Sequence, residues 1–170
     1  MQNDKDLTLA EIEFFDIMAL RVRHSLISFL SSRHFRRDSH VQKLCAIVVP
    51  IFFVQNQFAL ARNTAVVESQ TVQLWEILSY LDLEQCWYLY PDLLLWAFMF
   101  GVYTSTGQPK RPWFVYELAK GTRGWFSWQW KDLRKILLGF FYFDRLYEFE
   151  FKLICEEVRL LNVHLNSSPP

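Results

Sequence analysis

The segment that begins at Pro91 constrains the fold most strongly, because it is apolar on nearly every face of a helix. Pro91 suits the first helical turn, and Asp92 suits the positive end of the helix dipole. Residues 93–103 then form one of the longest apolar runs in the chain. This run is well short of the roughly 18–20 residues that a transmembrane helix needs. We therefore expect a helix over residues 91–102 at the centre of a core, covered by other helices.

The rest of the chain contains enough hydrophobic residues to cover such a helix. Of its 170 residues, 52% are hydrophobic, 21% are charged and 18% are aromatic. These values exclude an intrinsically disordered chain and a flexible linker, and the length suits one folded domain. We expect a single helical domain over residues 1–165, followed by a disordered tail at residues 166–170.

Apolar residues elsewhere recur at helical spacing, and no stretch shows the sustained alternation of a β-strand. The sequence therefore predicts an all-α fold, with about seven helices in a single bundle or array around an aromatic-rich core. We expect Phe149, Leu153, Val158 and Leu161 to point inward from the last helix. The predicted helices cover residues 8–32, 44–61 with a kink at Pro50, 67–83, 91–102, 112–121, 127–140 and 144–161.

The residue patterns that carry enzymatic chemistry or bind metals are missing from the sequence. Cys45, Cys86 and Cys155 are too far apart for a zinc site, and their odd number favours a reducing compartment. Residues 101–107 lack the Lys and the hydroxyl residue of a phosphate loop, so residues 104–109 are interpreted as a turn. Glu156 and Glu157 point about 100° apart on a helix, which fits a solvated face better than an acid–base pair. We expect no enzymatic activity, no metal and no cofactor.

Charge is balanced overall but uneven along the chain. The formal net charge is zero, which excludes a dedicated nucleic-acid binder. Residues 64–109 contain acids but no Lys or Arg, whereas bases dominate residues 21–43 and 110–135. Such sectors either steer self-association or docking to a partner, or neutralise each other inside the fold, and the sequence leaves both open. We interpret Trp125, Trp128 and Trp130 as core or interface residues rather than a base-stacking platform.

Three segments, in their order and spacing, resemble a known family. They are YPDLLLWAFMFG at residues 90–101, RPWFVYEL at 111–118 and WKDLRKIL at 130–137. The series resembles the C-terminal part of the fungal-specific transcription factor domain, the helical regulatory region that accompanies a zinc binuclear-cluster DNA-binding head. The resemblance covers about residues 40–158. The motif residues, which we expect to be structural, are Pro91, Leu95, Trp96, Gly101, Arg111, Trp113, Phe114, Trp130, Leu133, Ile136 and Leu137.

The resemblance implies a nuclear regulatory and interaction module that affects RNA polymerase II transcription and has no enzymatic activity. The family's DNA-binding head needs six clustered cysteines, and this chain has three scattered ones. Tyr142 and Cys155 also stand where the family commonly has tryptophan. We therefore expect a regulator without its own DNA-binding head, which binds no specific nucleic acid, spans no membrane, and takes a protein partner or a second copy of itself. A small-molecule effector is compatible with this role.

The alternative hypothesis is a small helical protein that associates with membranes or binds an apolar ligand. The apolar runs at residues 45–54 and 93–103 favour it. Fractionation with a carbonate wash would separate this alternative from the regulatory hypothesis.

Overall fold

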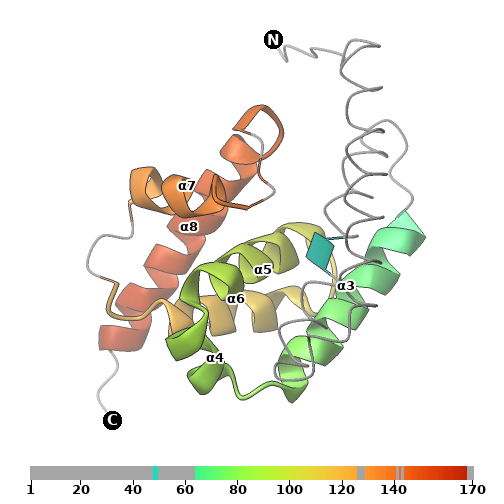
Figure 1. The fold of residues 1–170 in the computed structure, drawn as a ribbon, viewed down its shortest axis with the longest axis horizontal. Helices are drawn as coiled ribbons and strands as arrows, with labels where there is room; N and C mark the ends of the chain where they lie inside the picture. The colour runs from blue at the N-terminus through green and yellow to red at the C-terminus, as the bar shows by residue number, and fades with distance from the viewer. Residues whose placement is uncertain (1–47, 50–63, 126–128, 141, 143, 168–170) are drawn as a thin grey trace, which may run out of the picture. The chain divides into compact units, whose positions relative to one another are not determined.

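The computed structural model describes residues 48–49, 64–125, 129–140, 142 and 144–167. The chain divides into two units, Met1–Val67 and Glu68–Pro170, and we describe the second by itself. Every described element is helical, which confirms the all-α prediction for this part of the chain (Figure 1). The described helices are α3 (Thr64–Tyr80), α4 (Leu83–Leu89), α5 (Pro91–Thr104), α6 (Arg111–Gly121), α7 (Trp130–Leu137) and α8 (Asp144–Ser167).

Helix α5 forms the centre of the core, as its apolar sequence predicts. Pro91 lies at the first position of the helix and Asp92 in its first turn. Residues 94–102 are all buried, so no side of the helix faces solvent along this stretch. Helices α4, α6, α7 and α8 all contact α5. The apolar run is therefore buried by the protein's own helices.

Aromatic rings fill the space around α5. Phe100 makes edge contacts with Tyr147 and Phe151 of α8, with ring centroids 5.1 and 5.2 Å apart. Trp96 stacks on Phe140, which follows α7, at 5.4 Å. Aromatic pairs of this kind contribute about 0.5–1.5 kcal/mol each beyond the burial of their apolar surface. The predicted aromatic-rich core is thus present in the described part of the chain.

Helix α6 approaches α5 closely at Gly101. A Cβ atom placed on Gly101 would lie 2.5 Å from Cδ1 of Phe114, closer than real contacts allow. Phe114 is fully buried, so its ring has no open space into which to turn. Because Gly101 has no side chain, the Phe114 ring fits between the two helices at this crossing.

The segment between α5 and α6 is a turn, as predicted for residues 104–109. The hydroxyls of residues 104, 105 and 106 each donate to a backbone carbonyl three residues earlier, at 3.4, 3.1 and 2.9 Å. Gly107 adopts a left-handed φ of 78°, which glycine tolerates without strain. The three hydroxyls therefore close the end of α5.

The helix predicted over residues 67–83 differs from the structure. Helix α3 ends at Tyr80, and a short helix that was not predicted, α4, follows it. The Asp82 carboxylate accepts a hydrogen bond from the backbone N–H of Gln85 at 3.1 Å and caps α4. None of the seven residues of α4 is fully buried. With seven residues, α4 is too short for apolar periodicity to reveal it in the sequence.

The last two helices also differ from their predicted bounds. Helix α7 begins at Trp130 after an extended Gln129 and ends at Leu137, so it is shorter than the predicted 127–140. Helix α8 continues to Ser167, past the predicted end at residue 161. The first two residues of the predicted disordered tail are therefore helical, and residues 168–170 lie outside the described residues.

The prediction for the inward face of α8 was wrong at two of four positions. Val158 is fully buried and Leu161 is half-buried, but Phe149 is 72% exposed and Leu153 is 52% exposed. The buried face carries Tyr147, Phe151, Ile154, Cys155 and Val158 instead.

Several predictions fall outside the described residues. The predicted helix at residues 8–32, the basic sector at 21–43, Trp128 and most of the helix at 44–61 with Pro50 are among them. Val48 and Val49 are described, and both are helical and buried. The single domain over residues 1–165 stays a prediction.

Candidate functional site

Helix α8 carries apolar side chains on two opposite faces. One face is buried and contacts α5 and α6. At 100° per residue, a second set lies within a sector of about 80° on the opposite side of the helix. We call this set the α8 outer row, and it consists of Phe149 (72% exposed), Leu153 (52%), Leu160 (53%) and Val163 (53%).

The α8 outer row extends along the helix and is interrupted only at Glu156. Residues 149 and 163 are separated by about 21 Å at a rise of 1.5 Å per residue. Single exposed hydrophobic residues are common on protein surfaces, whereas a row along one helix is typical of an interaction site. Complete burial of one such side chain contributes about 1.5–3 kcal/mol. The row is therefore the candidate functional site.

Polar, mostly charged residues border the row on both sides, each set at a spacing of seven residues. On the helical wheel the bases fall on one side of the row and Glu150, Glu157 and His164 on the other. The bases are Arg145, Lys152 and Arg159.

Some of these charges already form ion pairs within α8. Lys152 contacts Glu148 at 2.7 Å, and Arg159 contacts Glu156 at 2.9 Å. These pairs are largely exposed, so each contributes little to stability. The side chains remain accessible to a protein that binds the row.

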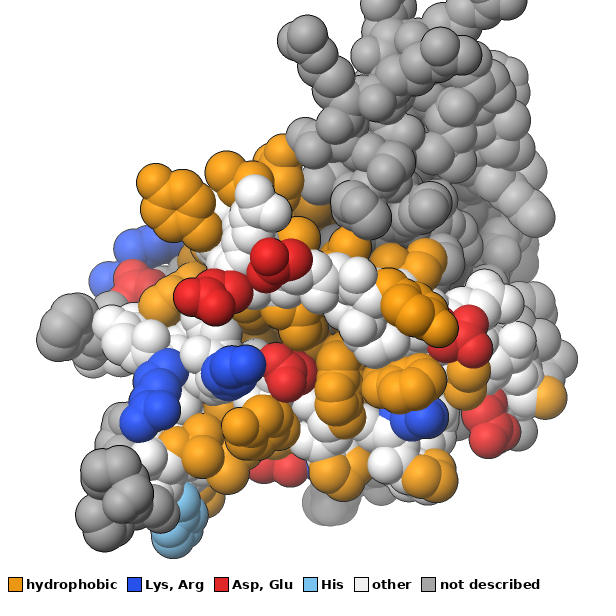
Figure 2. Space-filling model, turned by 90° about the horizontal axis from the view of Figure 1, so that it is seen from below, with side chains coloured by type: hydrophobic (Ala, Val, Ile, Leu, Met, Phe, Trp, Pro, Cys, Tyr) orange, Lys and Arg blue, Asp and Glu red, His pale blue; other side chains and the backbone are white. Residues whose placement is uncertain are grey.

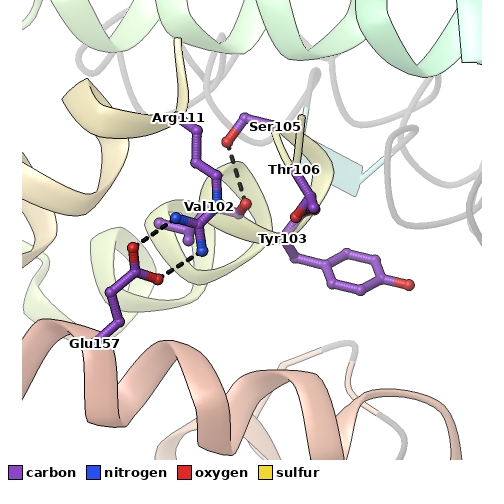
Figure 3. Close-up of polar contacts among 6 residues, drawn as sticks. All are labelled: Val102, Tyr103, Ser105, Thr106, Arg111 and Glu157. Carbon is purple, nitrogen blue, oxygen red and sulfur yellow. Dashed lines mark hydrogen bonds and ion pairs between the residues drawn. The ribbon is translucent and has the colours of Figure 1, made fainter. Parts of the chain in front are cut away.

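An ion pair with α6 fixes the rotation of α8 about its axis. Arg111, the first residue of α6, donates to both carboxylate oxygens of Glu157 at 2.5 and 2.6 Å (Figure 3). The hydrogen bond that Arg111 donates to Glu157 raises the pKa of Arg111. The sequence predicts a structural role for Arg111 but places Glu157 on a solvated face. Glu157 is partly exposed, as expected for a solvated face, but its side chain also bridges two helices, which the sequence did not predict.

Two further contacts hold the ends of α8. Arg134 of α7 donates to both carboxylate oxygens of Asp144 at 2.7 and 2.5 Å. The hydrogen bond from Arg134 lowers the pKa of Asp144. Near the other end, Arg123 donates to the carbonyl of Leu165 at 3.1 Å. These contacts support the orientation in which one apolar face of α8 is buried and the other faces solvent.

The motif residues lie in α5, α6 and α7, and none belongs to the α8 outer row. Gly101 and Phe114 meet where α5 and α6 cross, and Trp113 packs edge-on against Phe114 at 5.2 Å. Leu95, Trp96, Gly101, Phe114, Leu133 and Leu137 are buried, and Pro91, Arg111, Trp113, Trp130 and Ile136 are half-buried.

The tryptophans of the basic sector pack against rings of the same chain. Trp125 contacts Trp87 edge-on at 6.2 Å, and Trp130 contacts Tyr142 at 6.2 Å. Lys152 also lies over the Trp130 ring, at 5.8 Å. Trp125 and Trp130 therefore both have structural partners within the chain.

A second exposed apolar set lies at the end of α3 and on α4. Tyr80 and Tyr88 are each 86% exposed, and Leu89 is 51% exposed. Figure 2 shows that hydrophobic side chains on this side of the molecule are interspersed with acidic and basic ones. The set is shorter than the α8 outer row, and it is divided between the end of α3 and α4, a helix of seven residues.

The spacing of apolar residues in the sequence also indicates the α8 outer row, although only one apolar face is predicted for this helix. Residues 149, 153, 156, 160 and 163 alternate spacings of four and three, as do the buried residues 147, 151, 154 and 158. Two overlapping patterns of this kind on one helix leave its orientation open. The packing of Phe151 against Phe100 selects the buried face.

Neither a candidate metal site nor a candidate membrane-spanning helix occurs among the described residues. Within them, no three or more His, Cys, Asp or Glu residues gather where they would hold a metal ion. The described helices also include none that is long and apolar enough to cross a bilayer. In comparisons with known proteins, no family model, no curated protein and no solved structure matches this chain.

Proposed function

We propose that this chain is a protein-interaction module that regulates RNA polymerase II transcription in the nucleus. The α8 outer row is the single observation that carries the interaction role, because four large apolar side chains face solvent on one side of a helix that is anchored at both ends. The transcriptional role follows from the resemblance of residues 90–101, 111–118 and 130–137 to the fungal regulatory region.

The chemistry of the row favours a protein partner over a membrane or an apolar ligand. Glu156 lies between Leu153 and Leu160 with a side chain that is 64% exposed, and charges border both sides. An apolar centre with a charged rim is typical of protein interfaces. The run at residues 93–103, which favoured the alternative, is almost entirely buried in α5 and contributes little to a membrane surface.

A reporter assay tests this proposal. The full chain is fused to an unrelated DNA-binding domain and expressed in fungal cells, where reporter transcription and the location of the fusion are measured. We expect the fusion to change reporter output, and Leu153→Glu to remove the change. Leu89→Glu is the matched control, because Leu89 is 51% exposed on α4, away from the row.

Two results would contradict the proposed function. One is a fusion that reaches the promoter and leaves reporter output unchanged. The other is native chain that stays in the membrane fraction after a carbonate wash, which would support the membrane-associated alternative.

A further inference from the structure

The exposed face of α8 follows a heptad repeat. In a heptad written a to g, positions a and d form the seam between two helices of a coiled coil. With Leu146 at a, the seam positions are Leu146, Phe149, Leu153, Glu156, Leu160 and Val163. Five of the six are apolar, and the four residues of the α8 outer row are among them.

In the same register, the residues of α8 that form the domain's own core occupy heptad positions other than a and d. The buried residues Tyr147 and Ile154 occupy position b, and Phe151 and Val158 occupy position f. Position f lies opposite the a/d seam on a helix. One face of α8 therefore packs on α5 and α6, while the opposite face has the pattern of a helix with a second helical partner.

The charges that border the seam indicate which partner fits. Position g is basic at Arg145, Lys152 and Arg159, and position e is acidic at Glu150 and Glu157. In a parallel pair, each g residue faces the e residue five positions later on the other helix. Two copies of α8 would thus pair Arg145 with Glu150 and Lys152 with Glu157. An antiparallel pair would instead bring bases to bases and acids to acids.

From this pattern we infer that the α8 outer row binds α8 of a second copy of this chain, in parallel, as a short two-stranded coiled coil. The inference names the partner of the proposed interaction module and rests on that proposal. Glu157 keeps its bond to Arg111, since a carboxylate has about four acceptor sites and can also accept from Lys152 of the second copy.

Glu156 limits the strength of the pair. At a d position, the two Glu156 carboxylates of a parallel dimer face each other, and a polar seam residue specifies register at a cost in stability. The seam from residue 146 to residue 163 is only about 26 Å long. We therefore expect a weak dimer with a dissociation constant on the order of micromolar.

Sedimentation equilibrium of the full chain over a range of concentrations measures this dimer directly. Leu153→Glu is expected to weaken association at least tenfold, whereas Leu89→Glu leaves it unchanged. Glu156→Leu is expected to tighten association at least tenfold, because it replaces two facing carboxylates with two leucines. Misfolding gives aggregates of mixed size rather than a defined dimer, so a tighter dimer of the Glu156→Leu variant keeps the inference testable if Leu153→Glu fails to fold.

A charge reversal determines the direction of the two helices. Glu150→Lys places like charges together in a parallel pair and is expected to weaken association. The double variant Arg145→Glu with Glu150→Lys restores the opposite charges and is expected to recover it. In an antiparallel pair, Glu150→Lys would instead strengthen association, because the new lysine would face acidic residues of the other copy.

Two outcomes would overturn the inference. One is that both the parent chain and the Glu156→Leu variant stay monomeric at protein concentrations up to about 100-fold above the expected micromolar dissociation constant. The other is association that Glu150→Lys strengthens. If the chain is monomeric but its reporter output still depends on Leu153, the self-association fails and the proposed interaction function stands. If reporter output is also absent, both fail.

Discussion

Arg111 and Glu157, which are 46 residues apart in the sequence, form two parallel hydrogen bonds that join the start of α6 to the middle of α8. The planar guanidinium matches both carboxylate oxygens, an arrangement that a lysine cannot reproduce. The side chains are 27% and 40% exposed, so water still reaches the pair. We therefore expect the pair to set the orientation of α8 and to contribute only modestly to the free energy of unfolding.

Glu157→Gln is expected to lower the free energy of unfolding by about 1 kcal/mol, because it removes one charge of a partly exposed bidentate pair. Urea unfolding measured at submicromolar protein tests this value. Glu156→Gln is the matched control, since Glu156 pairs with Arg159 on the exposed surface and is expected to change stability by less than about 0.5 kcal/mol. Equal effects of the two substitutions would contradict the bridging role of Glu157.

Gly101→Ala is expected to destabilise the domain by up to about 2 kcal/mol. Alanine favours a helix over glycine by about 1 kcal/mol, but its Cβ would lie 2.5 Å from the buried Phe114 ring, and overpacking of a core costs about 1–3 kcal/mol. A double-mutant cycle with Phe114→Leu checks the cause. Gly101→Ala should cost less, or stabilise, when the smaller leucine is present, and an unchanged cost would show that the ring is not the obstacle.

Trp96→Ala is expected to lower the free energy of unfolding by about 3–5 kcal/mol, because the side chain is only 1% exposed and stacks on Phe140. Trp113 and Trp130 are half-buried, so we expect their alanine variants to cost less. Chemical unfolding of the three variants measures this order. A Trp96→Ala variant as stable as the parent would be incompatible with the core position of this ring.

Stability is expected to fall at acid pH partly through Asp144. The hydrogen bond from Arg134 lowers the pKa of Asp144 in the folded protein below its value in the unfolded chain. The resulting stabilisation is present above the unfolded pKa of about 3.9 and is lost as the pH falls through the lower folded pKa.

Unfolding in urea at a series of pH values from 7 to 2 tests this dependence. Asp144→Asn should be less stable than the parent at neutral pH, and the difference should shrink below about pH 4. Arg134→Gln should give the same pattern, because it removes the partner of the same carboxylate. A difference that stays constant across the acid range would show that the ion pair is not its source.

The sequence by itself determined the class of the fold and the position of its central helix. Pro91, Asp92 and the apolar residues that follow predict a helix with no solvent-facing side, and such a helix must be buried whatever surrounds it. The turn after it and the helix over residues 112–121 were likewise predictable, because proline and glycine limit the backbone locally.

Only the tertiary structure decided which face of α8 is buried. The helix has apolar residues both at 147, 151, 154 and 158 and at 149, 153, 160 and 163, and helical periodicity alone cannot choose between two such faces. The choice depends on Phe100 of α5, Arg111 of α6 and Arg134 of α7, which contact α8 from distant parts of the chain. Burial and ion pairing are properties of the assembled helices, so the partner of Arg111 and the exposed row appear only once the helices have packed.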